Sequence, residues 1–121
     1  MKIVYIAGPF RDDPEGNKVK FEAVALDLWQ KGFFVFNPIA NTYFMKGKFT
    51  EDEFARRDIQ AIRQLHFDAM LMLEGWECSL GARQERQAAI DTGIRVFLSV
   101  EDLCKWCDSS IAFESPIGEN S

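Results

Sequence analysis

Three side chains in this sequence have types and positions that could do chemistry together. Glu85 lies one turn into a predicted helix, on the same side as Ala82 and Ala89, and these small residues indicate a closely packed face. Asp58 lies within the apolar stripe of another predicted helix instead of on its solvated face. Tyr5 lies near the end of a predicted strand. Because a buried carboxylate costs free energy of desolvation unless it is paired or functional, both acids are candidates for chemistry.

Two carboxylates and a tyrosine that converge on one crevice suit the cleavage of an N-glycosidic bond. One carboxylate attacks or stabilises the anomeric carbon of the sugar as positive charge develops there, and the other gives a proton or a hydrogen bond to the departing base. Such a reaction requires no cofactor, neither a metal ion nor a redox group. A zinc site would need four residues to converge, namely Cys78, Cys104, Cys107 and His66. We expect reduced thiols at the cysteine positions instead.

Each of these side chains also has a purely structural interpretation. Glu85 would be favourable as an acid in the first turn of any helix. Asp58 would be satisfied by pairing with a residue from elsewhere in the fold, and Tyr5 would simply fill the core. Asp68, just before a predicted strand, is expected only to accept backbone hydrogen bonds. The elements that carry these residues therefore decide whether they can meet.

Apolar periodicity predicts those elements. Strands are expected over 2–7, 33–36, 68–73 and 94–98, and helices over 17–31, 50–65, 79–92 and 100–107. Thr50 and Glu53 form a capping box for the second helix. Residues 41–50 are expected to form a loop, and 109–121 a loose C-terminal tail. The alternation predicts one α/β domain over 1–108, with helices on both faces of an open parallel sheet of four to five strands.

In such a sheet, ligands bind beyond the carboxyl ends of the strands. The loops at 8–11, at 37–38 and at 75–79, with whatever follows Leu98, are expected there. Ser79 opens a helix at this edge, and the small residues that follow it expose backbone. Free amides and the helix dipole favour an anion such as phosphate at that position. Serine is equally common as a plain helix cap, so the feature has two interpretations.

Composition narrows the classes of partner. The chain has 121 residues, 47% of them hydrophobic, and a formal net charge of −5, which suits one compact domain. The acidic balance argues against polymeric nucleic acid, whose binding requires a surplus of Lys and Arg. No apolar run approaches the ~20 residues of a bilayer-spanning helix, and the N-terminal apolar stretch is too short for a signal peptide. We therefore expect no membrane association and a cytoplasmic location.

Four stretches of the sequence resemble the nucleoside 2-deoxyribosyltransferase-like superfamily. They are Tyr-Ile-Ala-Gly-Pro-Phe at 5–10, Asn-Pro at 37–38, Arg-Asp-Ile at 57–59, and Gly-Trp-Glu-Cys-Ser-Leu-Gly-Ala-Arg-Gln-Glu at 75–85. The last one follows the pattern Gly-Trp-x-x-Ser-x-Gly-Ala-x-x-Glu of a branch of small, DUF4406-like proteins that is common in bacteriophages and prophages. The resemblance covers roughly residues 1–98.

This resemblance implies a three-layer flavodoxin-like (Rossmann-like) domain, in a homodimer or larger homo-oligomer whose sites a neighbouring subunit completes. It implies that Glu85 is the nucleophile, that Asp58 acts on the base and that Tyr5 orients the glutamate. It also implies that Ser79 contacts phosphate, because members that hydrolyse nucleoside 5′-monophosphates carry serine there. Together with the loops above, it places a nucleoside or nucleotide against Gly8, Pro9, Phe10, Asn37, Trp76, Ser79, Gly81 and Ala82.

Three functions are compatible with the sequence. The first is an N-glycosidase that acts on a nucleoside 5′-monophosphate or a related nucleotide through a glutamate nucleophile, with or without deoxyribosyl transfer. The second is a non-catalytic nucleotide sensor that uses the same crevice. The third is an interaction module with a degenerate pocket. Turnover separates the first from the other two, and stabilisation by a nucleotide separates the second from the third.

Overall fold

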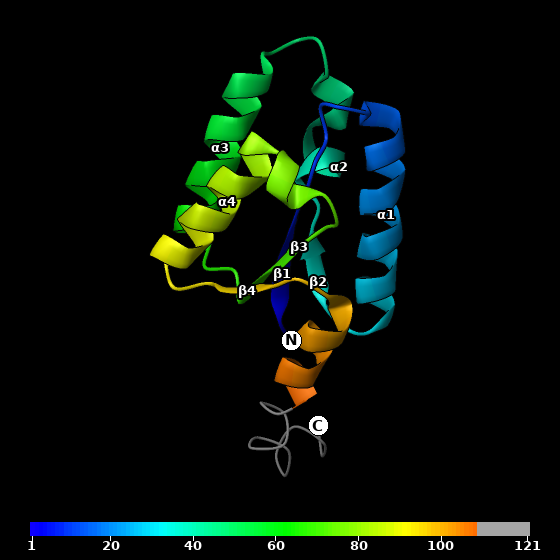
Figure 1. Cartoon of the computed structure of the whole chain (residues 1–121), viewed down its shortest axis with the longest axis vertical. Coiled ribbons are helices and arrows are strands. Elements are labelled where there is room, and N and C mark those ends of the chain that lie inside the picture. The colour runs from blue at the N-terminus through cyan, green and yellow to red at the C-terminus, as the bar shows by residue number, and fades with distance from the viewer. Residues whose placement is uncertain (109–121) are drawn as a thin grey trace.

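Four parallel strands form the centre of the protein (Figure 1). They are β1 (Ile3–Ala7), β2 (Phe34–Phe36), β3 (Ala69–Met72) and β4 (Arg95–Phe97), and their order in the sheet is β2-β1-β3-β4. The structure is a computed structural model that describes residues 1–108. The predicted tail over 109–121 lies outside the described residues. The predicted open parallel sheet is confirmed, with four strands.

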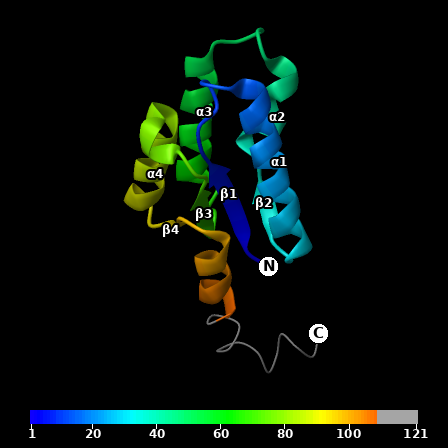
Figure 2. The same cartoon turned by 45° about the vertical axis from the view of Figure 1, so that its right-hand side comes forward.

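Two layers of helices cover this sheet. The helices α3 (Glu51–Gln64) and α4 (Leu80–Asp91) lie on one face, while α1 (Pro14–Gln30) and a helix over 100–108 lie on the other (Figures 1 and 2). The fold is therefore a three-layer α/β fold of the flavodoxin-like kind, as the sequence predicts. Within residues 1–108, no helix combines the length and the apolar character needed to cross a bilayer.

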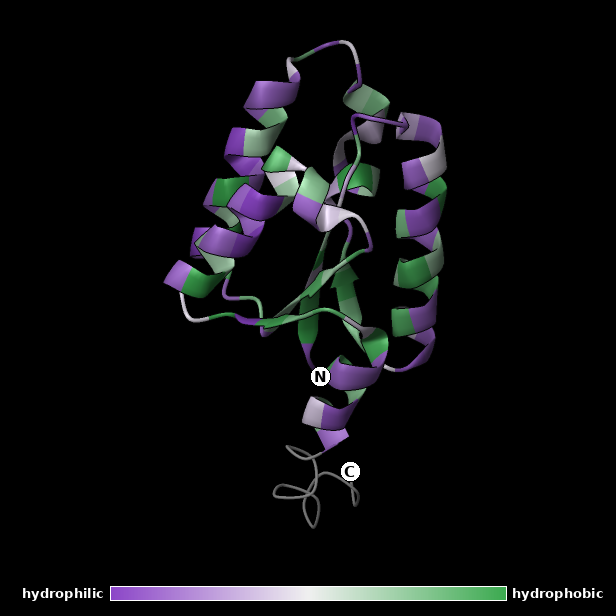
Figure 3. Ribbon diagram, viewed as in Figure 1, coloured by the Kyte–Doolittle hydropathy of each residue, from purple (hydrophilic) through white to green (hydrophobic). Residues whose placement is uncertain are grey.

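The central strand β1 divides the core into two clusters because its side chains alternate between the faces of the sheet. Val4 and Ile6 pack with α1 and the helix over 100–108, whereas Tyr5 and Ala7 pack with α3 and α4. The strands are accordingly mostly hydrophobic, with the exposed Arg95 of β4 as an exception, while the helices carry hydrophilic stretches (Figure 3). Tyr5 is aligned with Phe36 on β2 and with Met70 on β3, so it stands near the middle of the sheet.

Several local predictions are confirmed at the level of single hydrogen bonds. The hydroxyl of Thr50 accepts a hydrogen bond from the backbone N–H of Glu53, as expected for the start of α3. Asp68 accepts a hydrogen bond of 2.7 Å from the backbone N–H of Ile3, which is the bland role predicted for it. The backbone N–H of Asp68 in turn donates to the carbonyl of Ile3, so two hydrogen bonds join the beginnings of β1 and β3.

The segment predicted as a loop over 41–50 is partly helical, which corrects the sequence interpretation. It contains the end of α2 (Pro38–Thr42) and the 3-10 turn η1 (Tyr43–Met45). Asn37 caps α2 by accepting hydrogen bonds from the N–H groups of Ile39 and Ala40, and proline at the first helical position needs no partner for an N–H. Helix α1 likewise begins three residues earlier than predicted, at Pro14 instead of residue 17, with Asp13 as its cap.

The chain leaves α3 through an unusual backbone conformation. His66 has a φ of +53°, in the left-handed region that favours glycine, and it is exposed. This single turn follows the end of α3 and directs the next residue, Phe67, back into the core beneath β1.

Candidate functional site

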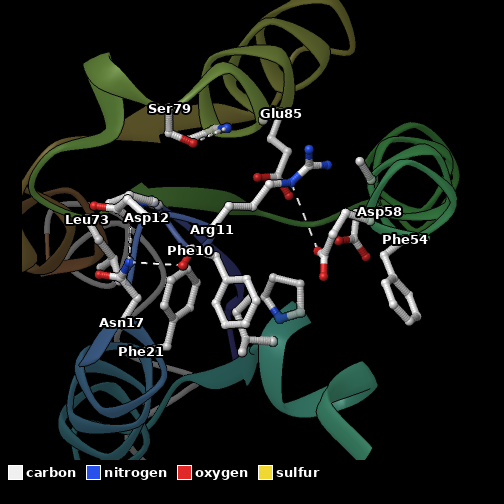
Figure 4. A pocket seen from close by; sticks show the side chains of 18 of the residues that line it. Phe10, Arg11, Asp12, Asn17, Phe21, Phe54, Asp58, Leu73, Ser79 and Glu85 are labelled. Carbon is white, nitrogen blue, oxygen red and sulfur yellow. Dashed lines mark hydrogen bonds and ion pairs between the residues drawn. The ribbon is translucent and has the colours of Figure 1, made fainter. Parts of the chain in front are cut away.

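A cavity of about 1020 Å³ lies at the carboxyl ends of the strands. Its walls come from the loop between β1 and α1, from α1 itself, from α2 and η1, from the first half of α3, and from the start of α4. In Figure 4, Ser79 and Glu85 point into it from one side, Asp58 and Phe54 from α3, and Phe21 from α1. The volume is at the upper end of the range for small-molecule sites and can hold a whole nucleotide.

The centre of the site is a hydrogen bond between elements that are far apart in the sequence. The hydroxyl of Tyr5, on β1, donates to the carboxylate of Glu85, in the second turn of α4. Tyr5 is completely buried, and its ring stacks on Phe36 with 5.4 Å between ring centroids. Phe67 meets the same ring edge-on at 5.3 Å. The side chain that holds Glu85 is therefore itself held by two further aromatic rings.

Both carboxyl groups of the site have raised pKa values. Burial raises the pKa of Glu85 to about 8; the hydrogen bond from Tyr5 opposes this rise, and the charge of Asp58 adds to it. Burial also raises the pKa of Asp58, to about 7. Because the two groups interact, they titrate as a pair and together keep about one proton near neutral pH. One acid and one base in a single cavity are what general acid–base chemistry requires.

The partner expected for Asp58 is not another residue of the described chain. Within residues 1–108, no cationic side chain or hydrogen-bond donor reaches its carboxyl group, and its pKa is raised by burial alone. It lies instead on the cavity wall, half-buried, on the same side of the sheet as Glu85. The carboxyl group is therefore available to a ligand.

The start of α4 offers a place for an anion on the same cavity. The hydroxyl of Ser79 caps the helix by accepting a hydrogen bond of 3.2 Å from the N–H of Ala82. Gly81 follows on the cavity wall, and a side chain added there would meet no atom within 4 Å. The first N–H groups of a helix lack partners within the helix, and the helix dipole adds partial positive charge there. A phosphate group fits this position chemically.

The loop between β1 and α1 forms the opposite rim and is fixed by α1. Asn17 is a buried polar residue whose side-chain amide donates to the carbonyl of Phe10 and to the carboxylate of Asp12, at 3.2 and 2.7 Å. Gly8, at the start of the loop, passes so close to Leu73 that an added Cβ would lie 2.8 Å from the leucine Cβ. The close approach explains glycine at this position.

The cavity gathers most of the residues nominated from the sequence. Its lining includes Gly8, Pro9, Phe10, Asp58, Ser79, Gly81, Ala82 and Glu85. Tyr5 joins the site from beneath, through its hydrogen bond. Asn37 and Trp76 do not line it: Asn37 caps α2, and Trp76, in the 3-10 turn η2 (Trp76–Cys78), packs on the core with the guanidinium of Arg86 5.0 Å from its ring centre.

One wall of the cavity was not foreseen in the sequence. Pro38, Ile39, Thr42 and Tyr43 line it from α2 and η1, in the segment that was expected to be mainly loop. A signal for α2 was present, since Asn37 followed by Pro38 is a typical helix cap and first turn. No periodic pattern over so short a helix supports it, which is why the pair reads equally well as a turn.

The thiols lie apart from this chemistry, with the exception of Cys78. Cys78 is exposed and lines the cavity next to Ser79, Cys104 is half-buried, and Cys107 is buried. None of the three forms a disulfide. Over the described range 1–108, no group of three or more His, Cys, Asp or Glu residues is arranged to hold a metal ion.

Residues 2–98 match a family described as a domain of unknown function (DUF4406), so the match spans every residue of the site. No curated protein matches the chain.

Proposed function

The chain belongs to the DUF4406 family, whose description names no activity, and we propose that it is an N-glycosidase acting on a nucleoside 5′-monophosphate or a related nucleotide. The observation that carries this proposal is the hydrogen bond from Tyr5 to Glu85 in a cavity that a second carboxyl group, Asp58, also lines. The arrangement supplies an oriented nucleophile and a separate proton donor. These are the two groups that cleavage of an N-glycosidic bond uses.

The reaction follows from the roles of the two acids. A carboxylate oxygen of Glu85 attacks the anomeric carbon, the bond from this carbon to the base nitrogen breaks, and its electron pair leaves with the base. Asp58 gives its proton to that base. Water then attacks the anomeric carbon and frees Glu85, while its proton returns to Asp58; an acceptor base in place of water gives transfer instead of hydrolysis.

The protonation states favour this division of roles once the sugar is bound. In the free protein, burial raises the pKa of both acids, so the proton that the pair keeps belongs to the pair and not to one residue. Positive charge that develops at the anomeric carbon lies against Glu85 and favours its carboxylate form, which moves the proton to Asp58. The hydroxyl of Tyr5 stabilises the same carboxylate.

The 5′-phosphate is assigned to the start of α4. Ser79 and Gly81 lie at the start of α4 and line the same cavity as Glu85. A phosphate bound there and a sugar bound at Glu85 can therefore belong to one nucleotide. We place this activity in the cytoplasm, and the free thiols of all three cysteines agree with a reducing compartment.

A turnover assay tests the proposal. The protein is incubated with ribo- and deoxyribonucleosides and their 5′-monophosphates, and free base is measured by chromatography. We expect base release from a monophosphate, its loss in Glu85→Gln, and its retention in Glu77→Gln, which changes an exposed glutamate outside the cavity. No release from any candidate by the folded protein would overturn the proposal. Thermal stabilisation by an unaltered nucleotide would then indicate the sensor function, and no stabilisation the interaction module.

A further inference from the structure

We propose that Phe67 is a positioning residue for the site: it holds the ring of Tyr5 in the orientation from which its hydroxyl reaches Glu85. Phe67 lies in the same core cluster as Tyr5, on the face of the sheet that α3 and α4 cover, and only 7% of it is exposed. Nothing in its sequence context marks it as functional, because it lies in the short connection between α3 and β3. The effect of Phe67 on catalysis rests on the function proposed above, whereas its effect on the titration of Glu85 does not.

The aromatic rings of Tyr5, Phe36 and Phe67 each contact the other two. Tyr5 and Phe36 stack at 5.4 Å with an angle of 30° between ring planes, and Phe67 stands edge-on to Tyr5 at 68°. Phe36 and Phe67 complete the triangle at 5.6 Å. Stacked and edge-on contacts constrain a ring in different directions, so together they restrict both tilt and rotation of the phenol.

Among the groups described around Glu85, Tyr5 is the one that stabilises its carboxylate form. Across residues 1–108, Tyr5 is the hydrogen-bond donor that reaches Glu85. The other titratable group that acts on Glu85 is Asp58 of α3. Arg86, the neighbour of Glu85 on α4, lies over Trp76 instead. A small rotation of the Tyr5 ring therefore removes the interaction that, among the described residues, favours the carboxylate form of Glu85.

The position of Phe67 depends on the left-handed turn at His66. This residue follows the end of α3, and its φ of +53° turns the chain so that Phe67 enters the core instead of continuing outwards. Helix α3 also carries Asp58. One continuous segment thus places the acid that lines the cavity and the ring that supports the tyrosine.

The test is an NMR titration of the Glu85 carboxyl carbon in the free protein, with the signal assigned by its absence in Glu85→Gln. In Phe67→Leu, we expect the titration midpoint of Glu85 to move to higher pH, because the hydrogen bond from Tyr5 is weakened. Phe33→Leu is the matched control: Phe33 is 8% exposed, and it lies in the core cluster on the other face of the sheet. It should leave the midpoint unchanged.

A double-mutant cycle separates positioning from general hydration of the site. In a Tyr5→Phe background, Phe67→Leu should cause no further shift, since the hydroxyl through which it acts is gone. An unchanged midpoint in Phe67→Leu, or an equal shift in both backgrounds, would overturn the proposal. Phe67→Met, whose unbranched side chain can adapt to the space left by the ring, replaces the leucine variant if circular dichroism shows the latter to be unfolded.

Kinetics then connects the inference to turnover. With base release established, Phe67→Leu should lower kcat roughly tenfold with little change in KM, because positioning acts in the transition state. A changed KM with an unchanged kcat would contradict this role. If the parent releases no base, the proposed function fails, but the titration still decides whether Phe67 acts on Glu85 through Tyr5.

Discussion

Arg11 and Asp52 pair with each other in the lining of the cavity, with 3.4 Å between Nη2 of the arginine and Oδ1 of the aspartate. Glu51 approaches the same guanidinium to 4.0 Å. The pair joins the loop after β1 to the first turn of α3, the helix that carries Asp58. Both side chains are exposed, so water screens the attraction, and its contribution to stability is small.

Asp52→Asn should therefore change binding more than stability. The substitution removes a negative charge from the rim and frees Arg11, so we expect a KM for a 5′-monophosphate that is about two- to threefold lower and an effect that fades as salt is added. The free energy of unfolding should stay within about 0.5 kcal/mol of the parent. Asp102→Asn, on an exposed position of the helix over 100–108, is the control. Equal gains for a nucleoside without phosphate would contradict the electrostatic explanation.

The rate of base release should show a bell-shaped dependence on pH. With pKa values of about 7 and about 8 for the coupled pair, the form that carries one proton is most populated between these values. We expect the maximum of kcat/KM there, measured under one ionic strength. Asp58→Asn should abolish the bell and leave a single rise with pH, as Glu85 ionises. A flat profile in the parent would exclude the acid–base pair.

Stability should fall as the pH rises from about 4.5 to about 8. The pKa of Glu85 is raised from an ordinary value of 4.5 to about 8, so the folded state binds the proton more tightly than the unfolded state does. The resulting stabilisation is present below pH 4.5 and is lost as the pH rises through about 8. Thermal unfolding of the parent and of Glu85→Gln, compared from about pH 5 to about pH 9, should show a flatter profile for the variant.

Ser79→Asp separates the capping role of this residue from its proposed contact with phosphate. Aspartate is as good a helix cap as serine, so the free energy of unfolding should stay within about 0.5 kcal/mol of the parent. Its charge should raise the KM for a monophosphate at least roughly tenfold, by repulsion, with little change for a free nucleoside. Ser79→Ala, which loses the cap, should cost about 1 kcal/mol of stability. A KM that is unchanged in Ser79→Asp would remove phosphate from this position.

His66→Gly should stabilise the protein. Its φ of +53° is costly for a residue with a Cβ atom, and its side chain is exposed, so little is lost with it. We expect a gain of about 0.5–1 kcal/mol in urea unfolding. His66→Ala keeps the cost and should show no gain. Equal stability of the glycine and alanine variants would mean that the turn carries no strain.

The sequence predicts the fold well because the dominant signals are local and repeat. Alternation of apolar strands with amphipathic helices is sufficient to bring the ends of β1, α3 and α4 to one edge of a parallel sheet. The same alternation predicts that Glu85 and Asp58 lie on one crevice. The link to the nucleoside 2-deoxyribosyltransferase-like superfamily, and with it the homodimer, stays a prediction.

What the sequence could not supply depends on single conformations or on tertiary contacts. Whether Trp76 would face the ligand or the core depends on how η2 turns, and it packs on the core. The wall built by α2 follows from a cap and a proline over five residues, too short for a periodic signal. Phe67 reaches Tyr5 through one left-handed residue, His66, whose type does not announce that conformation.

The buried amide of Asn17 has a consequence for engineering this protein. From within α1 it donates hydrogen bonds to two residues of the preceding loop, so the conformation of this loop depends on the first turn of the helix. A loop transplanted alone from another protein would lack the helix residue that holds it in place. Such a transplant is therefore not expected to introduce a new ligand preference. The exchangeable module is the loop together with the first turn of α1.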